Sequence, residues 1–181
     1  LSAEENLAIL RRNRIRVVKI HPLFQGFALN DTRLWEIFEA FGDEYVVITH
    51  VGEGGDAYRN RLSHPGMVRD IARQFPDLRL VACHFGGYRI LDEAEQVLSG
   101  VDVVLETSWP PSLAKLRPER VRELIRRHGA ERLAFGSDWP MTSPADEIRA
   151  IEALGLSDDE TKLVLGGTMA RLLGIPSPWT R

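Results

Sequence analysis

Residues 46–52 read Val-Val-Ile-Thr-His-Val-Gly, and residues 80–86 show the same arrangement as Leu-Val-Ala-Cys-His-Phe-Gly. Each segment is a short apolar run that ends in a histidine, with a glycine two residues later. Short apolar runs bounded by turn residues are typical of buried parallel strands. Three further apolar runs end in ionisable residues: the first in Lys19 and His21, the second in Glu106, and the third in Asp138. Because the carboxyl ends of parallel strands meet at one edge, the sequence predicts a rim of polar side chains there.

Helix-forming segments separate these runs along the chain. The expected strands are 15–20, 45–49, 78–83, 101–106 and 132–136, and the expected helices are 1–13, 31–41, 65–75, 91–99, 118–128, 144–154 and 157–173. Residues 24–27 and 51–63 are expected to be loops, and the second, which contains three glycines directly after His50, is a candidate lid. This alternation predicts an α/β fold whose parallel strands are joined by right-handed crossovers.

The composition is that of a globular protein without an electrostatic signature of nucleic-acid binding. Of the 181 residues, 44% are hydrophobic and 27% are charged, and the net charge is -3. We therefore expect a single domain over residues 1–181 and no nucleic-acid partner. Cys83 is the only cysteine, which excludes an internal disulfide and favours a reducing compartment. No apolar run reaches about 18 residues, so we expect no membrane segment and a cytoplasmic location.

Lys19 and His21 occupy alternate positions at the end of the first expected strand. Alternate side chains of a strand face the same side, about 6.6 Å apart. Both residues can therefore reach the predicted rim and are candidate site residues. The structural alternative is that Lys19 pairs with a buried carboxylate and that His21 caps a loop.

His50 and His84 each follow a strand and lie just before glycine. Glycine allows a sharp turn that leaves the imidazole uncovered for a metal ion or a substrate. Either histidine alone is more often a hydrogen-bonded core residue, but the matched pair favours a ligand function.

Asp138 and Glu106 are the acidic residues of the predicted rim. Asp138 lies in Phe-Gly-Ser-Asp-Trp-Pro, where bulky neighbours would desolvate its carboxylate, and a divalent metal ion would supply a partner. Such a carboxylate can also take a proton from a metal-bound water, whereas the structural alternative is the cap of a turn. For Glu106 three positions remain open: behind a ligating histidine, facing the substrate, or paired with Lys19.

Three other residues with reactive side chains are interpreted as structural. His64 precedes Pro65 in a polar segment, and His128 lies in the last turn of a helix, where a cation suits the helix dipole. Cys83 should point away from the side of His84, so we expect it to pack in the core.

With these residues in place, the chain resembles the amidohydrolase superfamily, in particular its amidohydrolase-related, or type 2, branch. The segments that carry the resemblance are 18–22 with 24–27, 48–52, 75–78, 82–87, 106–108, 135–140 and 166–174. They occur in the family's order and extend over nearly the whole chain. The terminal segment departs from the family in one respect, because Gly167 or Thr168 stands where an asparagine is usual.

The resemblance implies a (β/α)8 TIM barrel of which this chain covers about strands four to eight. Members of the family hold one or two divalent ions, usually zinc and in some cases manganese, at the carboxyl ends of the strands. His50 then matches the ligand of strand five, His84 the histidine of strand six, and Asp138 the aspartate of strand eight. In one-metal members the strand-six histidine contacts the substrate or the metal-bound water, and in two-metal members it is a ligand. Lys19 matches the strand-four position, where some members use a carboxylated lysine as a bridge.

The largest departure from the family is the absence of a His-x-His pair, which normally ends the first strand. Strands one to three are therefore expected to be missing from this sequence. Five strands do not close such a barrel, and His50, His84 and Asp138 alone would hold zinc more weakly than a full set of ligands. A natural start upstream of Leu1 is the expected explanation.

These residues predict a metal-dependent hydrolase that acts on amide, lactone or ester bonds of a small carboxylated or cyclic molecule. Asp138 would accept the proton of the attacking water, and His84 would stabilise charge on the substrate oxygen. One alternative is a metal-dependent decarboxylase or hydratase on the same scaffold. An alternative of another class is a metal-free remnant that acts as a binding or assembly module. The expected partner is a small-molecule substrate, and homo-oligomerisation is left open.

Overall fold

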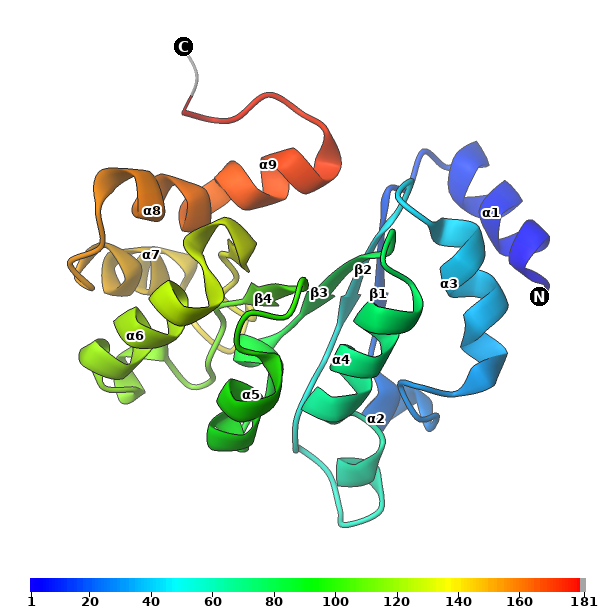
Figure 1. Cartoon of the computed structure of the whole chain (residues 1–181), viewed down its shortest axis with the longest axis horizontal. Helices are drawn as coiled ribbons and strands as arrows, with labels where there is room; N and C mark the ends of the chain where they lie inside the picture. Colours follow the sequence, from blue (N-terminus) through cyan, green and yellow to red (C-terminus); the bar gives the residue numbers. More distant parts are fainter. Residues whose placement is uncertain (180–181) are drawn as a thin grey trace.

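A single sheet of five parallel strands organises the structure, a computed structural model that describes residues 1–179 (Figure 1). The strands are β1 Val17–Ile20, β2 Val46–Thr49, β3 Arg79–Ala82, β4 Val104–Glu106 and β5 Leu133–Ala134. They pair in the order in which they occur along the chain. This order is that of consecutive strands of a (β/α)8 barrel, which confirms the predicted fold class as an arc of such a barrel. Thr180 and Arg181, which the predicted domain includes, lie outside the described residues.

Helices and short turns connect the strands. The α-helices are α1 Ala3–Arg12, α2 Pro22–Gln25, α3 Trp35–Phe41, α4 Pro65–Gln74, α5 Leu91–Leu98, α6 Pro118–His128, α7 Pro144–Glu152, α8 Asp158–Lys162 and α9 Thr168–Leu173. The 3-10 turns are η1 Thr32–Leu34, η2 Arg59–Arg61, η3 His84–Gly86, η4 Leu113–Lys115 and η5 Ala130–Arg132, and a π-helical turn, η6, covers Leu163–Gly167. Figure 1 shows α3, α4, α5 and α6 following one another across the sheet. None of the helices within residues 1–179 is long and apolar enough to cross a membrane.

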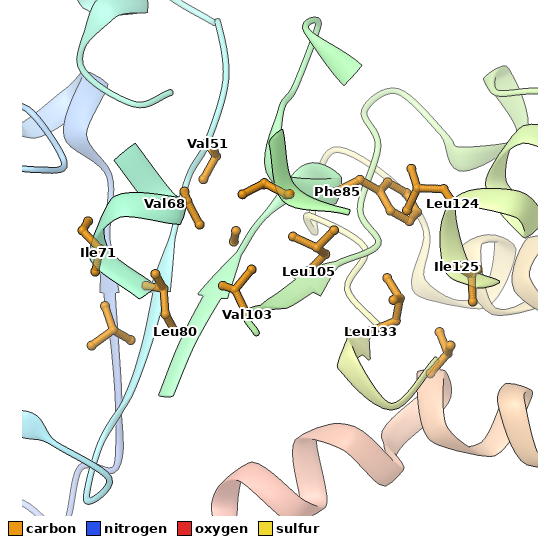
Figure 2. Packing of buried hydrophobic residues seen from close by; sticks show 14 of the residues in the cluster. Val51, Val68, Ile71, Leu80, Phe85, Val103, Leu105, Leu124, Ile125 and Leu133 are labelled. Carbon is orange, nitrogen blue, oxygen red and sulfur yellow. The ribbon is translucent and has the colours of Figure 1, made fainter. Parts of the chain in front are cut away.

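The two faces of the sheet bury different sets of side chains. Leu80, Leu105 and Leu133 belong to the larger core, which packs the strands against the helices (Figure 2). Val46, Val81, Val104 and Ala134 form a second cluster on the other face, and Met169 and Leu172 of α9 pack partly against it. Because side chains alternate along a strand, residues two positions beyond this second cluster share its face. That inner face therefore continues to the carboxyl ends of the strands, where the ionisable residues lie.

The structure differs from the predicted elements in several places. The expected loop 51–63 contains the 3-10 turn η2, and the expected helix 31–41 begins as the 3-10 turn η1. Residues 24–27 were expected to be a loop, but α2 forms a single helical turn that ends at Gly26, whose φ of 75° is left-handed. The expected strands 101–106 and 132–136 are shorter in the structure, with three and two residues. The expected helix 157–173 is divided by η6, where Gly166 leaves the helical conformation with φ 160° and ψ -24°.

Candidate functional site

Five of the six predicted site residues line one cavity of about 420 Å³ at the carboxyl ends of the strands. They are Lys19, His21, His50, His84 and Asp138. Apolar side chains complete the wall, namely Leu23, Phe24, Pro110 and Met141. A cavity of this size with convergent polar groups fits a small molecule. The predicted rim is therefore assembled, with Glu106 as the one member that does not line the cavity.

His21 lies between two other rings at one side of the cavity. Its ring centroid is 3.9 Å from that of Phe24 and 4.3 Å from that of His50, and both pairs are stacked within 12° of parallel. The Nδ1 atom of His21 is buried without a hydrogen-bond partner in the structure. Burial lowers the pKa of His21, and the charge of Lys19 lowers it further. His21 is thus held as a neutral ring against His50 rather than as the cap of a loop.

His84 reaches the cavity because the backbone turns sharply where β3 ends. The φ angles of His84 and Phe85 are 60° and 52°, in the left-handed region that residues other than glycine rarely adopt. In the structure, Nδ1 of His84 lies 3.2 Å from the carbonyl oxygen and 2.9 Å from Oγ of Ser108. Its Nε2 lies 3.1 Å from Nδ1 of His50. Both ring nitrogens of His84 are therefore engaged, and neither is free for a ligand in this arrangement.

Glu106 lies behind His84 and does not line the cavity. Its carboxylate accepts hydrogen bonds from the Ser108 backbone N–H at 2.7 Å, from Ser108 Oγ at 2.7 Å and from the His84 backbone N–H at 3.3 Å. The residue is only 9% exposed. A Cβ on Gly136 would come 1.8 Å from Glu106 Oε1, so glycine is required where the carboxylate crosses the end of β5. Glu106 is thus a buried support of the loop that carries His84.

Cys83 is buried, as expected of a packing residue, but it also contacts Lys19 of the site. Nζ of Lys19 donates to Sγ of Cys83 at 2.8 Å. Cys83 follows Val81 by two positions and therefore shares the inner face of the sheet. Alternation would place His84 on the outer face, but its left-handed φ turns the ring back. Burial, followed by the charge of Glu106, raises the pKa of the Cys83 thiol to about 12, so it is protonated.

His50 is the residue of the cavity best suited to bind an electron-pair acceptor. It is 7% exposed, and burial is the main cause that lowers its pKa to about 3, with further contributions from His84, His21 and Lys19. The ring is therefore neutral at neutral pH. Its Nε2 atom is buried and has no hydrogen-bond partner among residues 1–179. Neutral imidazole with a free nitrogen is the form that binds a metal ion or accepts a proton.

These residues fit a divalent ion only as part of a ligand set. The unpaired Nε2 of His50 is a suitable donor, and Asp138 lies in the same cavity. Within residues 1–179, however, no group of three or more His, Cys, Asp or Glu side chains is arranged to hold an ion. His50, His84 and Asp138 do not converge as one set, because Nε2 of His84 faces His50 and Asp138 is exposed. Their metal-binding function remains a prediction.

Asp138 follows β5 by four residues and has a left-handed φ of 56°. Its backbone carbonyl accepts from the Met141 N–H at 2.8 Å, which closes the turn, while its exposed side chain lines the cavity. The negative charge of Asp138 raises the pKa of His21 and of His84, although burial outweighs this effect in both. The aspartate is therefore close enough to influence the histidines electrostatically.

Sequence reasoning missed three residues of the site. Ser108 joins Glu106 to His84, and its only signal was its position two residues after Glu106 in the same strand end. Tyr88 and Arg89 line the cavity as well, with the Arg89 guanidinium 5.3 Å from the centroid of the Tyr88 ring. They belong to the loop after β3, whose course depends on the left-handed turn at His84 and Phe85.

The two histidines interpreted as structural do not line the cavity. Nδ1 of His64 accepts from the Gly66 N–H at 3.3 Å and caps α4. His128 is 1% exposed, and its nitrogens lie 3.1 Å and 2.7 Å from the carbonyl oxygens of Leu98 and Val103. It thereby ties α6 to the end of α5 and to the segment before β4.

Comparisons with known structures find the same fold at low sequence identity. An uncharacterized TIM-barrel protein from Bordetella bronchiseptica superposes with a TM-score of 0.76 and 20% identity, over 96% of this chain and 63% of that protein. The 5-carboxyvanillate decarboxylase LigW from Sphingomonas paucimobilis gives a TM-score of 0.70 and 16% identity, over 96% and 63%. A candidate 2-pyrone-4,6-dicarboxylic acid hydrolase from Pseudomonas putida gives 0.65 and 20%, over 96% and 68%.

The chain thus spans 63% of the length of the first two of these proteins. No curated protein sequence matches it. The profile of the amidohydrolase family matches residues 2–175, which is nearly the whole chain. The chain therefore belongs to the amidohydrolase family, whose members are generally metal-dependent enzymes.

Proposed function

We propose that this chain forms part of the active site of a metal-dependent hydrolase, at the carboxyl ends of its strands. The substrate is proposed to be a small carboxylated molecule with an amide, lactone or ester bond. The observation that carries the proposal is the Nε2 atom of His50, which is buried and unpaired beside a cavity that Asp138 also lines. Leaving a buried polar atom without a partner costs about 1–3 kcal/mol, so a ligand at this nitrogen would remove an existing penalty.

The side chains of the cavity divide the chemistry between them. When bound, a divalent ion, zinc or manganese, would supply an activated water and polarise a carbonyl. His50 Nε2 and the Asp138 carboxylate are its proposed ligands in this chain. Asp138, whose side chain is exposed to the cavity, would accept the proton of the attacking water. His84 holds the ring of His50 in place through the contact between Nε2 and Nδ1.

Two cations at the cavity fit a carboxylated substrate. Lys19 and Arg89 line it, and neither forms a salt bridge with a carboxylate in the described part of the chain. Guanidinium groups bind carboxylates in a bidentate manner, which suits Arg89 to orient such a group. Phe24, which is 78% exposed, offers an apolar surface for a planar ring.

The same two cations also favour a second candidate, a metal-dependent decarboxylase. A carboxylate held at the cavity could be the group that is lost rather than a handle for orientation. The likeness in fold to the 5-carboxyvanillate decarboxylase agrees with this candidate, and the likeness to the candidate 2-pyrone-4,6-dicarboxylic acid hydrolase agrees with the first.

An assay of the zinc- or manganese-loaded protein separates the two candidates. The test substrates are carboxylated lactones, amides, esters and aromatic acids. The assay records bond cleavage or ring opening and, in parallel, the release of carbon dioxide. The hydrolase proposal expects cleavage without carbon dioxide. Asp138→Asn should lower kcat by at least about 100-fold with an unchanged circular dichroism spectrum, because the side chain is exposed. Glu53→Gln, at another carboxylate of the same cavity, is the matched control and should retain most of the activity. Carbon dioxide release would establish the decarboxylase instead, and full activity of Asp138→Asn would refute the general-base assignment.

A further inference from the structure

The hydrogen-bond partners of His84 determine which of its ring nitrogens carries the proton. Two atoms of Ser108 face Nδ1, the carbonyl oxygen at 3.2 Å and Oγ at 2.9 Å. A carbonyl oxygen can only accept. The single hydroxyl hydrogen of Ser108 is donated to Glu106 Oε2 at 2.7 Å. Both atoms that face Nδ1 of His84 are therefore acceptors, and Nδ1 must be the protonated nitrogen.

The protonated nitrogen of His84 also determines which nitrogen of His50 carries a proton. A neutral His84 protonated at Nδ1 has a lone pair at Nε2, which lies 3.1 Å from Nδ1 of His50. A hydrogen bond between these nitrogens then requires His50 to donate from Nδ1. The other nitrogen of His50, the unpaired Nε2, is left with a lone pair. The contacts form one directed chain from His50 through His84 and Ser108 to Glu106.

We propose that Glu106, acting through the hydroxyl of Ser108, sets the tautomers of both His84 and His50 and thereby keeps a lone pair on Nε2 of His50. Glu106 and Ser108 are positioning residues, since neither lines the cavity. The importance of the lone pair for catalysis rests on the proposed function, whereas the tautomers follow from the contacts alone. In neutral histidine the tautomer protonated at Nε2 could neither bind a metal ion nor accept a proton at that atom.

Nitrogen NMR tests this proposal without any substrate or metal. Two-bond proton–nitrogen correlation spectra of protein with ¹⁵N-labelled histidine distinguish the two neutral tautomers, and the chain's five histidines can be assigned by single substitutions. At neutral pH, His84 and His50 are expected to be protonated at Nδ1. In Glu106→Gln the amide would donate to Ser108 Oγ, the hydroxyl would turn toward Nδ1 of His84, and both rings are expected to switch to the form protonated at Nε2.

Glu147→Gln is the matched control for this substitution. Glu147 is 1% exposed and likewise accepts from a serine hydroxyl and a backbone N–H, those of Ser112 and Leu113, both at 2.9 Å. It contacts no histidine of the site, so this variant should leave both tautomers unchanged. A shift in Glu147→Gln as large as in Glu106→Gln would mean that loss of any buried carboxylate perturbs the rings, and it would overturn the proposal.

Ser108→Ala provides a second variant if Glu106→Gln does not fold. It leaves Nδ1 of His84 only the longer contact to the carbonyl, so a measurable fraction of the Nε2-protonated form is expected at His84. The proposal would be overturned if His84 or His50 of the wild-type protein were protonated at Nε2. It would also be overturned if His84 remained completely protonated at Nδ1 in both Glu106→Gln and Ser108→Ala. Absence of hydrolysis or metal binding together with the expected tautomers would instead count against the proposed function alone.

Discussion

Nε2 of His84 lies 3.1 Å from Nδ1 of His50, and this contact joins the ends of β2 and β3 at the candidate site. The two histidines, which the sequence places in matched positions at strand ends, therefore differ in what they can do. His50 keeps one unpaired nitrogen, whereas both nitrogens of His84 are engaged. A direct contact of His84 with a metal ion or a substrate would require this hydrogen bond to break.

Arg89 should bind the carboxylate of the substrate. Arg89→Ala removes the guanidinium at the cavity and is expected to raise KM by about 10-fold while kcat changes little, because such a contact holds the ground state and the transition state alike. Steady-state kinetics with a carboxylated substrate and its methyl ester measure the effect. Arg69→Ala, at an arginine paired with Asp70 on α4, should behave as wild type. Equal losses of activity in the two variants would exclude a specific contact.

Gly136 should tolerate no side chain. Gly136→Ala would place a Cβ 1.8 Å from Glu106 Oε1, so the buried carboxylate or the end of β5 must shift. We expect a loss of about 2–4 kcal/mol in the free energy of unfolding, measured by urea denaturation. Gly54→Ala, whose Cβ would lie 3.7 Å from Leu23, should change this free energy by less than about 0.5 kcal/mol. Similar stabilities of the two variants would contradict the crowding at Gly136.

Cys83 should react slowly with thiol reagents in the folded protein. It is 4% exposed, and its pKa of about 12 leaves almost no thiolate at neutral pH. Since the thiolate is the reactive form, we expect alkylation by iodoacetamide to be at least about 100-fold slower in native protein than in protein unfolded by urea. Mass spectrometry gives both rates without ambiguity, because Cys83 is the only cysteine. Comparable rates would show that the thiol is neither buried nor protonated as described.

His128 should make the stability of the protein depend on pH. Burial is the main cause that lowers its pKa below the ordinary value of 6.5, and nearby Arg132 adds to this effect, although the carbonyls of Val103 and Leu98 and the charge of Glu131 oppose it. The unfolded chain then takes up the proton first as the pH falls below 6.5, so the free energy of unfolding decreases in that range. His128→Gln should reduce this dependence in urea denaturation at several pH values. An unchanged slope would mean that His128 does not titrate as its burial implies.

The arrangement of the strands was predictable from the sequence because it follows from short-range patterns. Apolar runs alternating with amphipathic segments specify parallel strands joined by helices, and the ionisable residue after each run specifies the rim. Five of the six predicted rim residues, Lys19, His21, His50, His84 and Asp138, line one cavity, whereas Glu106 does not.

The details of the site depend on backbone conformations that the pattern does not encode. Strict alternation places Cys83 and His84 on opposite faces, but the left-handed φ of His84 and Phe85 turns the imidazole back toward His50 and the cavity. The connection of Ser108 with His84 depends on the same turn. The last predicted helix is likewise broken at Gly166, although helix propensity alone predicts only a weak helical residue there.

Metal content tests the central proposal most directly. The purified full-length protein, reconstituted with zinc or manganese and then desalted, should retain about one ion per chain or more by elemental analysis. His50→Ala should lower that content by weakening the affinity at least about 10-fold, while His64→Ala, at a histidine that caps α4 away from the cavity, should leave it unchanged. Retention of no metal by the wild-type protein, or equal retention by wild type and His50→Ala, would contradict a metal site built on Nε2 of His50.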